Sequence, residues 1–229
     1  MHHSRAFLAL LVALGVFALL LVGCEKNETV VGNDQIVGSG RIVSQARNLG
    51  SVNGIQVTSF AKVIITQDTV ESLRIEADDN IIGLVRSSVV GSDLVVGLPE
   101  GSYRNVTVRV YASMRNISRL ESLGAADFSA TNSIRTDSIT CRIKGAGSIT
   151  LAGTTNYERV EIIGAGDIHN FDLSSTTCTA SISGAGSIEL HATQRLDATI
   201  AGTGSITYAG NPPIVHQSVT GVGAIRPRP

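Results

Sequence analysis

Residues 141–149 read Cys-Arg-Ile-Lys-Gly-Ala-Gly-Ser-Ile, and close copies of this stretch recur through the C-terminal half of the chain. The central Gly-x-Gly-x-Ile motif, at 145–149, recurs four times further along the chain, at 164–168, 184–188, 202–206 and 221–225. A degenerate copy precedes it at 124–128. Successive copies from the degenerate one onward are 21, 19, 20, 18 and 19 residues apart. A fixed period near 20 residues is typical of a solenoid, in which each repeat stacks on its neighbours.

The residues that flank the motif alternate between apolar and polar. The position two residues before each first glycine holds Ile143, Ile162, Ile182, Ile200 and Val219. The position four residues after it holds Ile149, Ile168, Ile188, Ile206 and Ile225. Alternation with a period of two predicts a strand with one buried face. Each repeat is therefore predicted to be strand, corner, strand and loop, and the fold to be all-β, a right-handed parallel β-helix or solenoid.

The paired glycines are expected to form the corner of each turn. They allow backbone conformations and a close approach between chains that a Cβ atom would prevent. A Ser or Asp after the second glycine can bond to nearby backbone and fix the turn. The structural repeat glycines are Gly145, Gly147, Gly164, Gly166, Gly184, Gly186, Gly202, Gly204, Gly221 and Gly223.

The chain before the repeats is strand-like as well. Residues 41–123 lack the motif, but Leu73–Ala77 and Val106–Val110 alternate cleanly. Ile81–Ser88 fits either a short helix or another strand. No change in composition marks a linker, so 41–123 is predicted to pack on or cap the 124–229 repeats within one continuous domain, since a bare end rung would pair with another chain.

The first 40 residues indicate export. Phe7–Val22 is an uninterrupted run of 16 apolar and glycine residues, which suits the hydrophobic core of a signal peptide better than a membrane span. It ends in Leu-Val-Gly-Cys24, which resembles the bacterial lipobox. Residues 1–23 are therefore expected to be a lipoprotein signal peptide, Cys24 to be lipidated, and 24–40 to be a flexible tether. Because Glu25 rather than Asp follows the cysteine, the outer membrane is favoured over the inner one, with the face left open.

Composition narrows the function classes. The formal net charge is −1, and no basic stripe appears, which argues against a nucleic-acid partner. Export would permit a disulfide between Cys141 and Cys178. They stand two coils apart at different repeat positions, so their separation along the stack is about 9–10 Å, too long for a disulfide. Both are expected to be buried core thiols.

No constellation for catalysis or cofactor binding stands out, so neither a cofactor nor a metal is expected. The Gly-x-Gly pairs lack the third glycine and the helix of a dinucleotide site, and Gly-Ala-Gly-Asp167 only faintly resembles a calcium-binding turn. Asp127 and Asp167 share one repeat position about 9–10 Å apart, near the spacing for inverting glycoside hydrolysis, but Ser148 lies between them. The histidines share no repeat position, so they form no row of ligands: these are His169, His191 and His216.

Several phrases resemble one known family. These are Val-Ile-Ile-Thr-Gln at 63–67, Leu-Arg-Ile-Glu-Ala-Asp at 73–78, the repeated Gly-Ala-Gly-Ser-Ile, and Thr-Tyr-Ala-Gly-Asn-Pro at 207–212. Over about residues 50–226 the chain resembles the putative auto-transporter adhesin, head GIN domain family. The resemblance implies a β-helical domain found on bacterial lipoproteins and carries over no catalytic residue.

Three functions follow as hypotheses. The first is a non-catalytic cell-envelope lipoprotein that presents a solenoid for binding or adhesion, with a glycan or an envelope or surface protein as partner. Exposed rows that include Thr150 and Thr207 could hydrogen-bond such a glycan. The second is a structural or regulatory component of the periplasm, for which stackable ends favour a homo-oligomer. The third is a polysaccharide hydrolase or lyase acting through Asp127 and Asp167.

Overall fold

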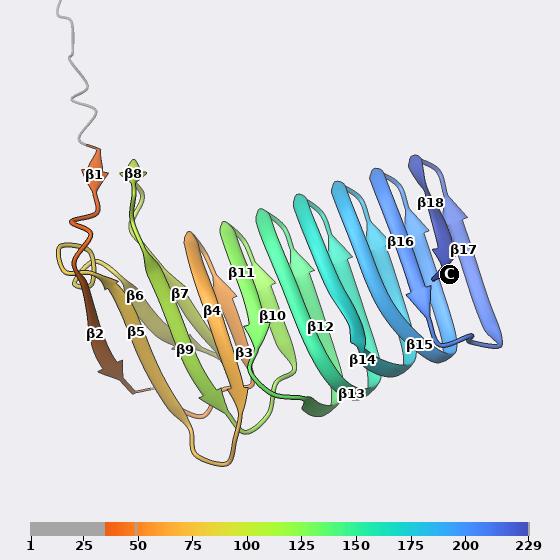
Figure 1. Cartoon of the computed structure of the whole chain (residues 1–229), viewed down its shortest axis with the longest axis horizontal. Helices are drawn as coiled ribbons and strands as arrows, with labels where there is room; N and C mark the ends of the chain where they lie inside the picture. Colours follow the sequence, from red (N-terminus) through yellow and green to blue (C-terminus); the bar gives the residue numbers. More distant parts are fainter. Residues whose placement is uncertain (1–34, 49, 229) are drawn as a thin grey trace, which may run out of the picture. The chain divides into compact units, whose positions relative to one another are not determined.

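The structure is a computed structural model that describes residues 35–48 and 50–228. These residues belong to one compact unit made of strands and turns, with no helix in the part of the chain described. Figure 1 shows the strands as successive flat turns of one coil that ends at β17 and β18. The predicted all-β solenoid is therefore confirmed.

Two long ladders of hydrogen-bonded strands form the walls of the coil. The ladder before the glycine corner contains, in spatial order, β6 (Arg86–Val90), β7 (Asp93–Gly97), β3 (Gly54–Val57), β10 (Arg119–Ser122), β12 (Ile134–Ile143), the second halves of β13 (Ala146–Ile162), β14 (Ala165–Ile182) and β15 (Ala185–Ile200), and β17 (Ile214–Val219). The ladder after the corner contains β2 (Ile42–Arg47), β5 (Ser72–Asp78), β9 (Val108–Met114), β4 (Phe60–Gln67), β11 (Ala125–Ala130), the first halves of β13, β14 and β15, β16 (Thr203–Ala209) and β18 (Val222–Pro227). All these pairs are parallel except β2–β5, β5–β9 and β6–β7.

The predicted apolar columns form the core. In the register of the sheet, Ile149 pairs with Ile168, and the column continues through Ile188 and Ile206. The column before the corner runs in the same way through Ile143, Ile162, Ile182 and Ile200, and all eight side chains are buried. Burying one such side chain contributes roughly 2 kcal/mol. Because each face is covered by the next turn, this stabilisation is shared between neighbouring rungs.

The glycine corner is set by the close approach of successive turns. A Cβ atom on Gly164 would lie 2.0 Å from the carbonyl oxygen of Gly145, and one on Gly184 would lie 1.9 Å from that of Gly164. No side chain larger than hydrogen fits there, so the backbone of the preceding rung requires glycine at each of these corner positions. A positive φ adds a second requirement at Gly147 and Gly186, where φ is 120° and 151°.

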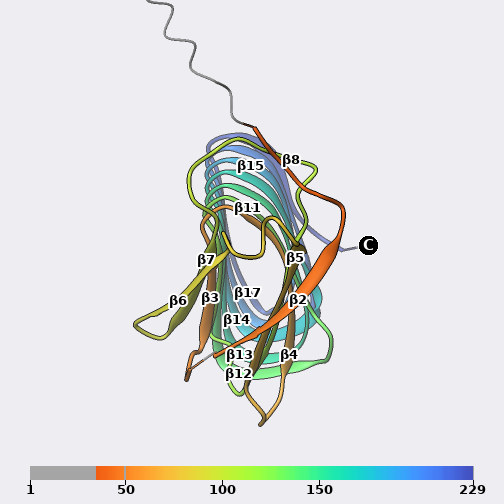
Figure 2. The same cartoon turned by 90° about the vertical axis from the view of Figure 1, so that its left-hand side faces the viewer.

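The N-terminal region extends both ladders, but its rungs do not stack in chain order. The β3–β4 rung lies between the β7–β9 rung and the β10–β11 rung, so the later β7 and β9 pack on its outer side. The antiparallel strands β2, β5 and β6 then cover this end, which faces the viewer in Figure 2. The stretch Ile81–Ser88, whose sequence fits either a short helix or a strand, forms turns over residues 81–84, and strand β6 begins at Arg86.

The end of the expected tether is bound to the domain rather than flexible. Strand β1 (Ile36–Val37) pairs in parallel with β8 (Tyr103–Arg104). The Gly40 amide then donates to Asp78 Oδ1 at 2.7 Å, and the Ser39 amide donates to Asn80 Oδ1 at 3.1 Å. These two side-chain oxygens accept hydrogen bonds from backbone amides of the segment that follows β1, which has no apolar pattern of its own. The last residues of the tether predicted over 24–40, from Ile36 to Gly40, therefore belong to the folded domain.

The two cysteines match their prediction, because Cys141 and Cys178 are both buried and free. The predicted signal peptide, the lipidated Cys24 and residues 24–34 of the tether lie outside the described residues.

Candidate functional site: a polar groove across the turns

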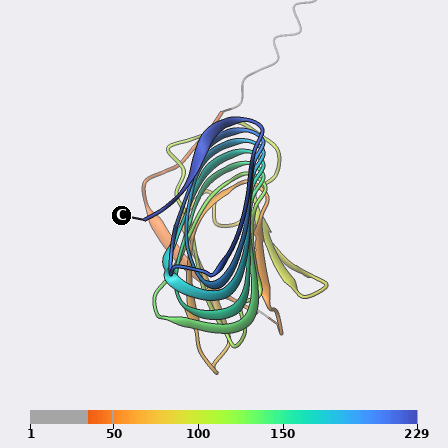
Figure 3. The same ribbon diagram turned by 90° about the vertical axis from the view of Figure 1, so that its right-hand side faces the viewer.

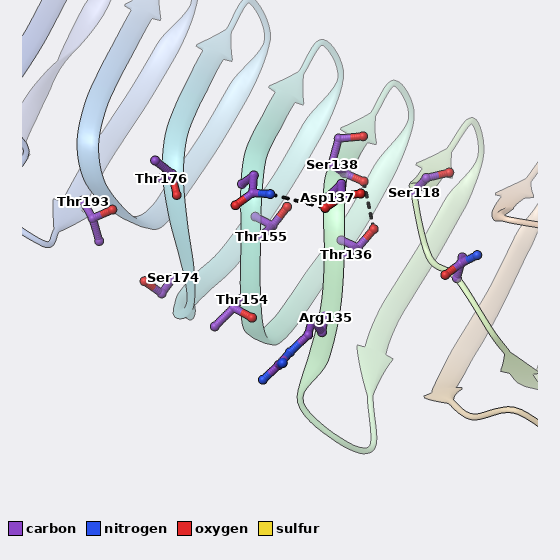
Figure 4. Close-up of a pocket in the computed structure, with 12 residues that line it drawn as sticks. Ser118, Arg135, Thr136, Asp137, Ser138, Thr154, Thr155, Ser174, Thr176 and Thr193 are labelled. Carbon is purple, nitrogen blue, oxygen red and sulfur yellow. Dashed lines mark hydrogen bonds between the residues drawn. The ribbon is translucent and has the colours of Figure 1, made fainter.

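A groove of about 640 Å³ crosses several turns at the bend opposite the glycine corner. It is lined almost entirely by short polar side chains, which are Asn116, Ser118, Arg135, Thr136, Asp137, Ser138, Thr154, Thr155, Asn156, Ser174, Thr176 and Thr193. Figure 4 shows that they come from neighbouring turns and repeat at similar places in each. The groove is therefore a product of the stacking, since no single turn forms it.

The sheet register explains how these residues come together. Arg135 pairs with Thr154 and Thr154 with Ser174, while Thr136, Thr155 and Ser175 form the adjacent row. Parallel strands lie about 4.8 Å apart, so each row presents one polar side chain per turn at that spacing. The bends carry hydroxyl and amide residues where the walls carry isoleucine, because a bend has less apolar core to cover.

Some of the groove side chains are fixed by local hydrogen bonds. The Thr155 hydroxyl donates to the Tyr157 carbonyl at 3.1 Å, and the Thr193 hydroxyl donates to the Ser175 carbonyl at 3.1 Å. Such bonds from a hydroxyl to a nearby carbonyl hold the bend in shape. They give the groove rigid walls.

Other groove side chains have hydrogen-bonding capacity to spare. The side chains of Thr154, Ser174 and Thr176 form no hydrogen bond to any other described residue. Thr154 and Ser174 are neighbours in the row that begins at Arg135. Each hydroxyl can donate one hydrogen bond and accept two. A ligand in the groove could therefore form hydrogen bonds with these hydroxyl groups without breaking any hydrogen bond within the protein.

Only two ionisable side chains line the groove. The carboxylate of Asp137 accepts a hydrogen bond from Asn156 Nδ2 at 3.3 Å. Apart from Arg135, the other residues that line the groove are neutral. Arg135 supplies the single cation, and no ion pair involving it is found among the described residues. The site is therefore a neutral polar surface rather than a charged one.

A buried polar cluster lies inside the coil on the same turns. The carboxyl of Glu158 on β13 is fully buried, and its Oε1 accepts from Asn170 Nδ2 at 2.7 Å. The Cys178 thiol lies 3.7 Å from Oε2, whereas the nearby Ser175 hydroxyl donates to the His191 carbonyl at 2.8 Å. Burial raises the pKa of Glu158 to about 7, because these neutral donors do not offset the loss of water around the charge.

The thiols of this cluster are not set up for chemistry. Burial raises the pKa of both Cys141 and Cys178, and the Glu158 carboxylate raises them further. A thiol is reactive as the thiolate, which these surroundings disfavour. The cluster is therefore part of the core rather than a nucleophilic site.

The threonines proposed from the sequence lie elsewhere. Thr150 and Thr207 stand on the ladder after the glycine corner, in a row that also contains His169 and Glu189. His169 Nδ1 lies 2.9 Å from a Glu189 carboxylate oxygen, within hydrogen-bonding distance, so these two side chains interrupt the row of threonines. Neither threonine lines the groove.

The two aspartates do share one row, as their repeat position predicts, but serines hold them. Asp127 pairs with Ser148 and Ser148 with Asp167, so a full turn separates the carboxylates. The Ser148 hydroxyl donates to Asp127 Oδ1 at 2.7 Å, and the Ser187 hydroxyl donates to Asp167 Oδ1 at 2.6 Å. Both carboxylates thus bridge neighbouring turns.

The histidines are dispersed over the ladders. His216 Nδ1 lies 2.8 Å from Asp197 Oδ1, whereas His191 is on a different ladder from His216. No group of three or more His, Cys, Asp or Glu side chains among the described residues is arranged to hold a metal ion. In the same part of the chain, no helix has the length and apolar character needed to cross a membrane.

The repeat pattern does not predict the groove, because the groove residues lie in the segments that it predicts to be loops. The signal is nevertheless present, as hydroxyl and amide residues cluster in each bend at the period of the repeat. These clusters are Arg-Thr-Asp-Ser at 135–138, Thr-Thr-Asn at 154–156 and Ser-Ser-Thr at 174–176. Aligning the bends as well as the glycine corners would have placed them side by side.

Solved structures of low sequence identity share this fold. A putative adhesin from Bacteroides fragilis is 23% identical, with a TM-score of 0.70 over 84% of this chain and 100% of that one. A putative lipid binding protein from Parabacteroides distasonis is 18% identical, with a TM-score of 0.55 over 85% of this chain and 100% of that one. A putative adhesin from Parabacteroides merdae is 21% identical, with a TM-score of 0.51 over 85% and 99%.

No curated protein sequence matches the chain significantly. The sequence model of one family does match, over residues 52–212, which include the capping strands β5 and β6, most of the stacked turns and all residues of the groove. The resemblance noted in the repeated motifs is thereby confirmed. The chain belongs to the putative auto-transporter adhesin, head GIN domain family.

Proposed function

We propose that this protein is a non-catalytic lipoprotein of the bacterial cell envelope that uses the rigid solenoid as an attachment surface. The observation that carries the proposal is the polar groove, which gathers side chains with unused hydrogen-bonding capacity from several turns. The adhesin description of the family agrees with such a role. The lipobox ending at Cys24 supports a lipid anchor, and Glu25 supports the outer membrane.

The groove suits binding better than catalysis. A hydrolase needs an acid and a second carboxylate on either side of the bond that it cleaves. The groove has a single carboxylate, Asp137, while Asp127 and Asp167 lie on another ladder and are bonded to serines. This arrangement supports retention of a ligand rather than its conversion.

The anchor is tested by metabolic labelling with a fatty acid. Cells producing the protein are fed a palmitate analogue that can be coupled to a fluorophore, and the Cys24→Ser variant serves as the control. We expect label on the parent protein and none on the variant. A labelled variant, or an unlabelled parent that is made in normal amount, would exclude lipidation at Cys24.

Exposure of the domain is tested by protease treatment of intact cells, with a periplasmic protein followed in parallel. Cleavage of the solenoid while the periplasmic protein survives is the result expected for an attachment surface. Protection until the outer envelope is opened would contradict it and would favour a structural or regulatory component of the periplasm, whose partners could be found by cross-linking.

A further inference from the structure

We propose that the groove binds an unbranched polysaccharide laid parallel to the solenoid axis, with successive sugar rings on successive turns. This inference rests on the proposed attachment function and names the ligand of the same site. It follows from three properties of the groove, which are its direction, its chemistry and its lack of aromatic and aliphatic side chains.

The direction of the groove follows the stack. Residues from five consecutive turns line it, from Asn116 and Ser118 on the first to Thr193 on the last. Four steps of about 4.8 Å give a length of roughly 19 Å. A pyranose ring linked through opposite sides advances by nearly the length of one such step. A linear glycan could therefore meet an equivalent group on each turn, whereas a branched or folded ligand would lose this match.

The chemistry of the groove matches a polyhydroxyl ligand. Ten of its twelve lining residues are neutral, and all ten are Ser, Thr or Asn. Their hydroxyl and amide groups both donate and accept hydrogen bonds, as sugar hydroxyls do. One cation, Arg135, is too few for a nucleic-acid backbone, whose affinity depends on several neutralised phosphates.

The absence of aromatic and aliphatic side chains from the groove lining argues against other ligands and sets the expected affinity. The core of a protein–protein interface is rich in aromatic and other apolar side chains, and the groove residues include none of these. A few net hydrogen bonds without stacking give a dissociation constant on the order of 1 mM for one chain. Attachment would then depend on many copies of the protein acting together.

The test measures binding of short linear oligosaccharides by saturation-transfer NMR. The full chain is purified in a phosphocholine detergent, which carries no sugar of its own. The probes are linear oligomers of glucose, N-acetylglucosamine, mannose and galacturonic acid, each from two to seven units. In at least one series we expect the dissociation constant to fall by about tenfold from two to five units and then to level off, because five turns line the groove.

Matched variants connect this binding to the groove. The double variant Thr154→Val/Ser174→Ala removes two unused hydroxyls at little change in shape, and it should weaken the bound series by roughly tenfold. The control Thr150→Val/Thr207→Val makes the same kind of change on the other ladder and should leave binding within about twofold. Circular dichroism spectra and melting curves of both variants should overlay those of the parent.

Two results would overturn the inference. One is that affinity does not depend on chain length in any of the four series, and the other is that the control variant loses as much binding as the groove variant. These failures are separate from failure of the proposed function. A protein that is lipidated and cleaved on intact cells but binds no oligomer keeps the function and loses the ligand class. A protein that binds the oligomers but is protected on intact cells does the reverse.

Discussion

The buried Glu158 makes a sharp prediction about the pH dependence of stability. Its pKa is raised from an ordinary value near 4.5 to about 7, because the folded chain surrounds the carboxyl with Asn170, Cys178 and the apolar core. Between these two pH values the folded state binds more protons than the unfolded state. Stability contributed by the neutral carboxyl is therefore complete below about pH 4.5 and is lost as the pH rises through 7.

The magnitude follows from the difference between the two pKa values. At 1.36 kcal/mol for each tenfold change in proton affinity, the folded state loses about 3 kcal/mol between pH 4.5 and pH values well above 7. The Glu158→Gln variant keeps an oxygen that accepts from Asn170 and has no charge at any pH. It should lack this loss, and it should be more stable than the parent at pH 8.5 by up to about 3 kcal/mol.

The assay is urea denaturation at pH 5, 6, 7, 8 and 9. The chain has no Trp, so far-ultraviolet circular dichroism is the suitable probe of its strands. The parent midpoint should fall as the pH rises from 5 to about 7 and then level off, and the Glu158→Gln midpoint should fall much less. Glu71→Gln, which changes an exposed carboxylate at the surface, is the matched control and should keep the parental slope. Equal slopes for the parent and Glu158→Gln, or a variant less stable than the parent at pH 8.5, would refute the reasoning.

Three further predictions concern the stack itself. Gly164→Ala places a Cβ atom 2.0 Å from the Gly145 carbonyl oxygen and should lower the free energy of unfolding by about 3 kcal/mol, measured by thermal or urea unfolding. Gly83→Ala, with no atom within 4 Å of its Cβ, should change stability little. Equal effects of the two substitutions would contradict the account of the corner. The thiols of Cys141 and Cys178 should react with a maleimide only after the protein is denatured, and labelling of the native chain at a comparable rate would show that they are accessible. Amide hydrogens of β17 and β18 should exchange with solvent faster than those of β14. Val219 and Val222 are exposed on the last turn, which is seen end-on in Figure 3, whereas β14 is paired with a strand on both sides. Equal protection of all these strands would mean that the end of the solenoid is covered.

The turns of the C-terminal half could be predicted because their signals are local and repeated. The isoleucine columns and the paired glycines recur with one period, so a strand-and-corner unit follows from the sequence of a single repeat. The inward position of Glu158 also follows from this alternation, since it lies two residues before the buried Val160. What the alternation alone does not show is that its partners are Asn170 and Cys178 from the next turn.

The N-terminal cap could not be predicted because its pairings are long-range. Placing β3 between β7 and β10 requires choosing among strands of similar apolar alternation, and nothing in their sequences distinguishes the partners. The bound end of the tether depends in the same way on Asp78 and Asn80, which are distant in sequence. The groove was missed for another reason, because bends lack the strict alternation of the walls and vary in length from turn to turn.

The central claim, attachment through the groove, is tested most directly by multivalent adhesion. Vesicles carrying many copies of the lipidated full-length chain are passed over surfaces coated with linear polysaccharides of the four sugars named above. Many weak contacts acting together should hold parent vesicles on at least one surface, even if single-chain affinity is near 1 mM. Vesicles with Thr154→Val/Ser174→Ala should be released, and those with Thr150→Val/Thr207→Val should be held like the parent. Retention of the groove variant at the level of the parent, or release of the parent from every surface, would contradict the account.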